Sequence, residues 1–184
     1  MKPSFPNYKN VFFALIAYLL IFSLQANAHD KWLVLGNTGW VSGDDRLTLD
    51  MPSVSHPDLR ITSNAAGDLQ WIEMHIPFTL GGTIKGIYLC YKTPNEGTFI
   101  SQIRLAEYLI PGTATVRHDD PTDLVSSEGS CYLSTVGNYT PGGSVNLSLR
   151  LNFANPGDRI DLGALGVLIG SADNDDDHDD DDDD

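Results

Sequence analysis

The stretch Ser144–Phe153, SVNLSLRLNF, alternates strictly between polar and apolar side chains. An α-helix would scatter the apolar residues around its circumference, whereas a β-strand places them all on one face. The stretch therefore predicts a half-buried strand, with one face in a core and the other in solvent. The five residues on the apolar face are Val145, Leu147, Leu149, Leu151 and Phe153.

Similar short stretches occur on both sides of this strand, separated by turn signals such as Pro111-Gly112 and Pro141-Gly142-Gly143. Short strands at regular spacing predict an all-β domain, an antiparallel β-sandwich of jelly-roll-like or Ig-like type, with a barrel as the alternative. Residues 101–109 could also form a helix. The other expected strands are Lys31–Leu35, Arg46–Leu49, Gln70–Ile76, Thr83–Tyr91, Ser101–Leu109, Thr113–His118, Ser130–Thr135 and Asp161–Ile169.

The N-terminus has the three parts of a secretory signal peptide. Lys2 and Lys9 precede the apolar run Val11–Phe22, and Ala26-Asn27-Ala28 fits a signal-peptidase site. Residues 1–28 are therefore predicted to be removed on export, and an uncleaved anchor is the alternative. We expect the mature chain to be secreted, in the extracellular space or the periplasm, with no transmembrane segment.

The chain is acidic, with a formal net charge of −14. Ten acids lie among its last twelve residues, 173–184. Like charges at this density oppose collapse, so we expect residues 29–170 to form one β-sandwich domain and residues 171–184 a disordered Asp-rich tail. The tail could bind calcium or contact a basic partner, or it could serve only solubility. An acidic body repels phosphate backbones, which argues against nucleic acid as a partner.

The chain contains two cysteines, Cys90 and Cys131. In an oxidising compartment such a pair usually forms a disulfide, and two buried free thiols are the alternative. No Cys-x-x-Cys motif and no Gly-x-Ser-x-Gly motif is present in the sequence. The few glutamates form no recognisable catalytic pair, so the sequence favours a protein that is not an enzyme and offers no catalytic residue.

Two sets of residues are candidates for metal binding. Cleavage after Ala28 would leave His29 at the N-terminus, where its amine and imidazole could hold one copper ion, as in secreted copper enzymes that oxidise polysaccharides. The alternative is that His29 is only the residue that follows the cleavage site. The polar stretch 117–123 contains His118 together with Asp119, Asp120 and Asp123, and the aspartate oxygens suit calcium. The alternative for this stretch is an Asp-Pro turn with an Asx cap, since it lacks the residues of an EF-hand.

Three tryptophans could stack on sugar rings, as aromatics do in carbohydrate-binding sandwiches. Trp32 and Trp71 lie in expected strands, which favours positions in the core. Trp40 lies beside Gly39 and before a loop, so it is the predicted candidate for an exposed ring that stacks on a ligand.

A strand that ends in Cys90, the His118-Asp119-Asp120 turn and the pair Cys131-Tyr132 together resemble uncharacterised bacterial secreted β-sandwich proteins. The resemblance covers the body from Trp71 onward. It implies the sandwich and the pairing of the two cysteines, and it implies no activity.

The sequence thus favours a secreted, non-catalytic β-sandwich that binds or assembles outside the cell. Self-association, the cell envelope and an extracellular polymer are the expected partners, with cation modulation. A copper-dependent oxidase that uses His29 and a calcium-binding protein that uses the Asp-rich tail are the alternatives.

Overall fold

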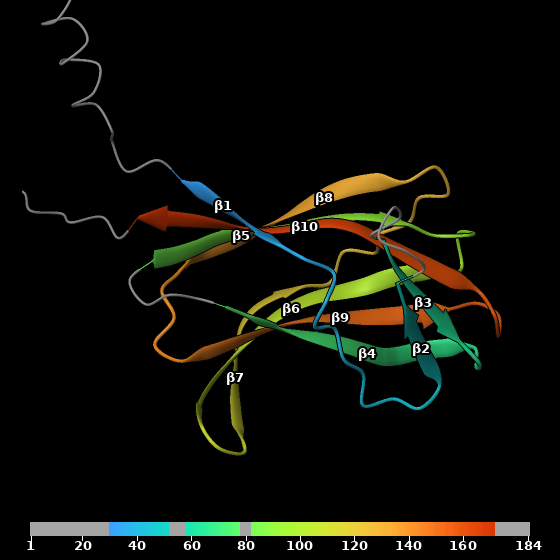
Figure 1. The fold of residues 1–184 in the computed structure, drawn as a ribbon, viewed down its shortest axis with the longest axis horizontal. Helices are drawn as coiled ribbons and strands as arrows, with labels where there is room; N and C mark the ends of the chain where they lie inside the picture. The colour runs from blue at the N-terminus through green and yellow to red at the C-terminus, as the bar shows by residue number, and fades with distance from the viewer. Residues whose placement is uncertain (1–29, 52–57, 78–81, 172–184) are drawn as a thin grey trace, which may run out of the picture.

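A computed structural model of the chain describes residues 30–51, 58–77 and 82–171, which contain ten β-strands. The strands form two antiparallel sheets that face each other as two layers (Figure 1). The prediction of an all-β antiparallel sandwich is therefore confirmed. Among the described residues, no helix is long and apolar enough to cross a membrane.

Sheet A has the strand order β2-β3-β10-β5-β8, and β1 pairs with the second half of β10. The long last strand β10 thus pairs with β3 at its start and with β1 at its end, while β5 runs along its other side. The bounds in this sheet are β1 Lys31–Leu35, β2 Leu47–Asp50, β3 Leu59–Ser63, β5 Gly82–Lys92, β8 Ser130–Tyr139 and β10 Arg159–Ser171.

Sheet B has the strand order β4-β9-β6-β7, which places β9 between two neighbours and leaves β7 at an edge. Strands β6 and β7 form a hairpin whose turn contains Gly112, with a φ of 78° that favours glycine. The bounds in this sheet are β4 Gly67–Ile76, β6 Phe99–Ile110, β7 Thr113–Asp120 and β9 Ser144–Phe153.

The core lies between the two sheets and is built from the inward positions of their strands. All five apolar residues of β9 are fully buried, as the alternation in the sequence predicts. They face apolar residues of sheet A, including Ile87 and Leu89 of β5 and Leu162 of β10. Because the apolar side chains point inward, the polar side chains of β9 are left on the outer face of sheet B.

The structure corrects two predictions about the strands and decides between two alternatives for a third segment. Strand β3 was not expected, because its alternating residues Leu59–Ser63 are few and follow a polar stretch. The predicted strand Ser101–Leu109 is confirmed, because these residues belong to β6 and not to a helix. Strand β7 continues past His118 to Asp120, so the expected turn begins two residues later.

Cys90 and Cys131 form a disulfide, which confirms the predicted pairing. They are direct partners in the ladder between β5 and β8, so the bond links two neighbouring strands of sheet A and not the two sheets. The predicted signal peptide, His29 and the Asp-rich tail after Ser171 lie outside the described residues and stay predictions.

Candidate functional site

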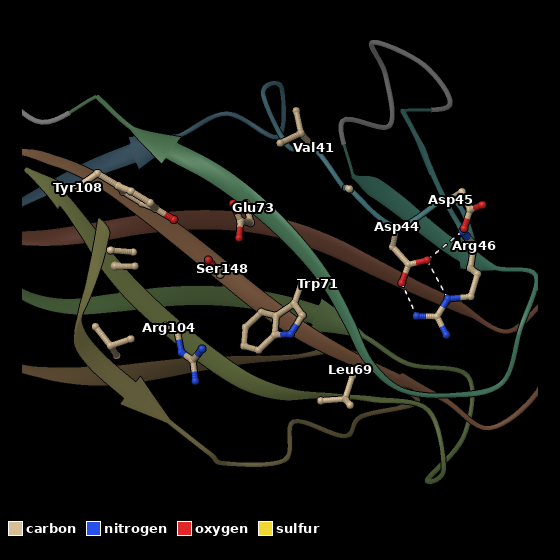
Figure 2. Close-up of a pocket in the computed structure, with 14 residues that line it drawn as sticks. Val41, Asp44, Asp45, Arg46, Leu69, Trp71, Glu73, Arg104, Tyr108 and Ser148 are labelled. Carbon is tan, nitrogen blue, oxygen red and sulfur yellow. Dashed lines mark hydrogen bonds and ion pairs between the residues drawn. The ribbon is translucent and has the colours of Figure 1, made fainter. Parts of the chain in front are cut away.

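The outer face of sheet B carries a groove with a volume of about 710 Å³ (Figure 2). Strand β9 forms its floor with Ser148, a small side chain that is almost fully buried. Larger side chains rise on both sides, because β4 contributes Trp71 and Glu73 and β6 contributes Arg104 and Tyr108. A small residue between larger ones explains why this face is hollowed.

A row of polar side chains crosses all four strands at the level of Ser148. In the ladder, Glu73 of β4 pairs with Ser148, Ser148 pairs with Arg104 of β6, and Arg104 pairs with Asp119 of β7. Arg104 donates two hydrogen bonds to Asp119, from Nε to Oδ1 at 3.1 Å and from Nη2 to Oδ2 at 3.3 Å. The row thus places an acceptor, a hydroxyl and a donor side by side on an open face.

Two aromatic side chains flank this row. In Figure 2, Trp71 and Tyr108 lie on opposite sides of Ser148. The guanidinium of Arg104 lies over the Trp71 ring, 4.9 Å from its centroid, which is cation–π geometry. Asp119 also holds this guanidinium, so Arg104 links the Trp71 ring to β7.

The rim of the groove near β4 is a turn that an ion pair between Asp44 and Arg46 stabilises. The Arg46 guanidinium and amide both donate to the Asp44 carboxylate, and this pairing lowers the pKa of Asp44 below its ordinary value. Two backbone hydrogen bonds between Val41 and Glu73, at 2.9 and 2.8 Å, fix the segment before the turn to β4. The rim is therefore tied directly to the strand that carries Glu73.

A buried carboxylate supports the other end of the groove. Glu107, the neighbour of Tyr108 on β6, points inward and is 2% exposed. It accepts hydrogen bonds from Arg117 Nε at 2.8 Å and from the Gly142 amide at 2.6 Å. Burial acts to raise the pKa of Glu107, but these donors outweigh burial and the pKa is lowered. The bonds join β6 to β7 and to the loop before β9, which holds Tyr108 in place.

Known structures share this architecture. No protein-family model and no curated protein sequence matches the chain. The xylan-binding domain CBM22-1 of Xyn10C from Paenibacillus barcinonensis aligns with a TM-score of 0.53 and 10% identity, over 80% of this chain and 99% of that one. The family 29 carbohydrate-binding module CBM29_1 from Piromyces equi aligns with a TM-score of 0.50 and 14% identity, over 79% and 94% of the two chains. At these identities the likeness is one of fold.

His118 and Asp120 point inward from β7 and meet Ser134 of β8. Ser134 Oγ lies 2.7 Å from His118 Nε2 and donates to Asp120 Oδ2 at 2.5 Å. A nucleophilic triad needs the acid on the other nitrogen of the histidine and an accessible serine. Here both groups bond the same oxygen, and Ser134 is fully buried. The network therefore joins the edge strands of the two sheets and has no nucleophilic geometry.

The predicted metal ligands do not all converge in the structure, because His118 and Asp120 meet at Ser134 while the other two lie elsewhere. Asp119 and Asp120 point to opposite faces of β7, and Asp119 is paired with Arg104. Asp120 Oδ1 accepts the Thr122 amide at 3.0 Å, which is an Asx turn. Asp123 is exposed on the following loop. Among residues 30–51, 58–77 and 82–171, no group of three or more His, Cys, Asp and Glu side chains is placed to hold a metal ion. Cation binding by these residues stays a prediction.

The prediction that Trp40 is an exposed ring that stacks on a ligand is wrong. Trp40 is 8% exposed and belongs to the core cluster, so it offers no open ring to a sugar. Trp71, which was expected in the core, lines the groove instead. Its neighbours Ile72 and Gln70 are buried, so the alternation along β4 was the signal that places Trp71 on the outer face.

Proposed function

We propose that this protein is an exported, non-catalytic module that binds a polysaccharide chain along the groove on sheet B. The observation that carries the proposal is the pair of aromatic rings, Trp71 and Tyr108, on either side of the polar row in an open groove. An open groove can accept the middle of a long polysaccharide, because neither end of the polysaccharide has to fit into a closed pocket.

The groove offers both kinds of contact that a sugar needs. The faces of pyranose rings carry C–H groups that stack on aromatic side chains, whose π-faces are negative. The hydroxyl groups at the ring edges donate and accept hydrogen bonds, and Glu73 and Arg104 supply acceptors and donors between the two aromatic rings. The neighbours in fold are named as carbohydrate-binding modules, one of them xylan-binding, and this supports the same ligand class here.

Export is part of this proposal. A disulfide such as Cys90–Cys131 is typical of oxidising compartments, and the predicted signal peptide agrees with it. A polysaccharide ligand fits the extracellular polymer that the sequence suggested as a partner. Self-association and modulation by cations remain further proposals, for which light scattering with and without calcium is the test.

The two alternatives from the sequence concern residues outside the described part of the chain. Copper binding requires His29 at the mature N-terminus, and tight one-to-one copper binding that His29→Ala abolishes would establish it. Calcium binding by the tail would be lost on deletion of residues 173–184. Neither alternative requires the groove, but an oxidase that uses His29 would contradict the non-catalytic part of the proposal.

Affinity gel electrophoresis of the mature protein tests the proposal. The gels contain soluble glucans, xylans or mannans, and binding slows migration. We expect at least one polymer to retard the wild type, and Trp71→Ala to lose this retardation. Trp32→Ala is the matched control, because Trp32 is 48% exposed on β1 of sheet A, outside the groove. Retardation by no polymer, or full retention by Trp71→Ala, would contradict the proposal.

A further inference from the structure

Both arginines of the groove are already neutralised by carboxylates. Arg46 is bound by Asp44 through hydrogen bonds from Nε and from Nη2. Arg104 is bound by both oxygens of Asp119, with which it forms a salt bridge at 3.1 Å. A guanidinium that already has a bidentate carboxylate partner has little positive field left for an anionic ligand.

Glu73 has no such neutralising partner. Within the described ranges, no arginine, lysine or histidine forms an ion pair with it, and its side chain makes no hydrogen bond that would satisfy its oxygens. It lies at the end of the polar row, half-buried, beside Ser148. Asp45 on the rim is exposed and adds a second negative charge. The field in the groove is therefore negative.

We infer that the groove selects uncharged polysaccharides and rejects chains that carry carboxylate or sulfate groups, with Glu73 as the residue that sets this specificity. The inference rests on the proposed function, since it concerns the same groove. A uronate carboxylate in the groove would lie among Glu73 and Asp45 and would have to compete with Asp44 or Asp119 for an arginine. The hydroxyl groups of an uncharged sugar instead donate to the free Glu73 oxygens.

The electrostatic origin gives the specificity a recognisable dependence on salt. Repulsion between partly exposed charges is screened when the Debye length falls, from about 30 Å at 0.01 M to about 8 Å at 0.15 M ionic strength. Selection between an uncharged and an anionic polymer should therefore weaken as salt rises. A selection caused by the shape of the groove would not change with salt.

The test uses pairs of polymers that share a backbone and differ in charge. The pairs are hydroxyethylcellulose with carboxymethylcellulose, unsubstituted xylan with glucuronoxylan, and galactomannan with its sulfated form. We expect wild-type protein to bind the uncharged member of at least one pair about tenfold more tightly at 10 mM salt. Glu73→Gln keeps the shape of the side chain and removes its charge, so it should reduce this ratio to about threefold or less.

Glu128→Gln is the matched control. Glu128 is exposed in the loop before β8 and does not line the groove, but its substitution changes the net charge by the same amount. We expect it to leave the ratio unchanged. Equal or tighter binding of the anionic members, or a ratio that Glu73→Gln does not alter, overturns the inference and leaves the proposed function standing. Binding of no polymer in any pair overturns the proposed function itself.

Discussion

Two ion pairs of nearly equal length allow a direct test of how burial supports the groove. Arg117 Nη2 and Glu107 Oε2 are 2.7 Å apart, and Arg150 Nη2 and Asp68 Oδ2 are 2.6 Å apart. The side chain of Glu107 is 2% exposed, whereas that of Asp68 is 39% exposed. We therefore expect Glu107→Gln to destabilise the protein much more than Asp68→Asn, although the two substitutions are chemically alike.

The expected size for Glu107→Gln follows from its contacts. The glutamine can still accept the Gly142 amide through its carbonyl oxygen, but its amide group then faces the donors of Arg117. Hydrogen bonds to a charged group contribute about 1.5–3 kcal/mol each. Because the guanidinium is partly exposed and can regain water, we expect a loss of about 2 kcal/mol of unfolding free energy in total. For the exposed carboxylate Asp68 we expect less than about 1 kcal/mol.

Urea unfolding followed by tryptophan fluorescence measures both losses. With a slope of about 2 kcal/mol/M, the midpoint for Glu107→Gln should fall by about 1 M, and that for Asp68→Asn by less than half as much. Since Glu107 precedes Tyr108 on β6, the same variant should also weaken polysaccharide binding in the gel assay. Equal midpoint shifts for the two variants would refute the argument that burial, and not distance, decides the energy of these pairs.

Three further predictions test the fold, its pH dependence and the groove. Replacing Cys90 and Cys131 by serine opens a loop of 41 residues and should lower the unfolding free energy by roughly 4 kcal/mol; unchanged stability would contradict the chain-entropy argument. Burial lowers the pKa of His118 below the ordinary value of 6.5, despite the nearby charges of the next two residues. The unfolded chain therefore takes up this proton first, so the wild type should lose stability as pH falls from about 6.5 toward the lower folded pKa, and His118→Asn should lack this loss in the same unfolding assay. Ser148→Phe fills the groove floor from an outward position, so binding in the gel assay should disappear while circular dichroism stays that of the wild type.

Much of the fold could be predicted because alternation is a local property of the sequence. The residues of β9 show a strict period of two, and their strand has the bounds that were predicted. The disulfide could be predicted because the chain has two cysteines and its predicted signal peptide indicates an oxidising compartment. Strand β3 was missed because five residues carry too little pattern, and what stabilises it is pairing with β2, the preceding strand, and with β10, which is distant in the sequence.

The groove could not be predicted in the same way, because its residues meet only through the register of four strands. Glu73, Ser148 and Arg104 lie far apart in the chain and become neighbours across β4, β9 and β6. The aromatic residue was misassigned for a related reason. The loop position of Trp40 suggested exposure, but the segment after β1 packs its ring into the core. The position of Trp71 within a strand suggested burial, although a strand has two faces.

The two outer faces of the sandwich arise from the same alternation, yet they use small residues in opposite ways. On sheet A, a Cβ at Gly166 would lie 3.3 Å from the Trp32 ring, and a Cβ at Gly86 would lie 3.0 Å from Leu133. These glycines leave space that neighbouring side chains occupy, and Trp32 packs edge-on against Tyr88, with their ring centroids 5.7 Å apart.

On sheet B, the space above Ser148 is left open between Trp71 and Tyr108. A surface region whose hollows are filled by its own side chains, as around Gly86 and Gly166, exposes little space to a ligand, whereas one that keeps aromatic rings apart over an open floor can bury them against a partner. The difference between these faces is why Trp71, and not the more exposed Trp32, is the tryptophan on which binding should depend.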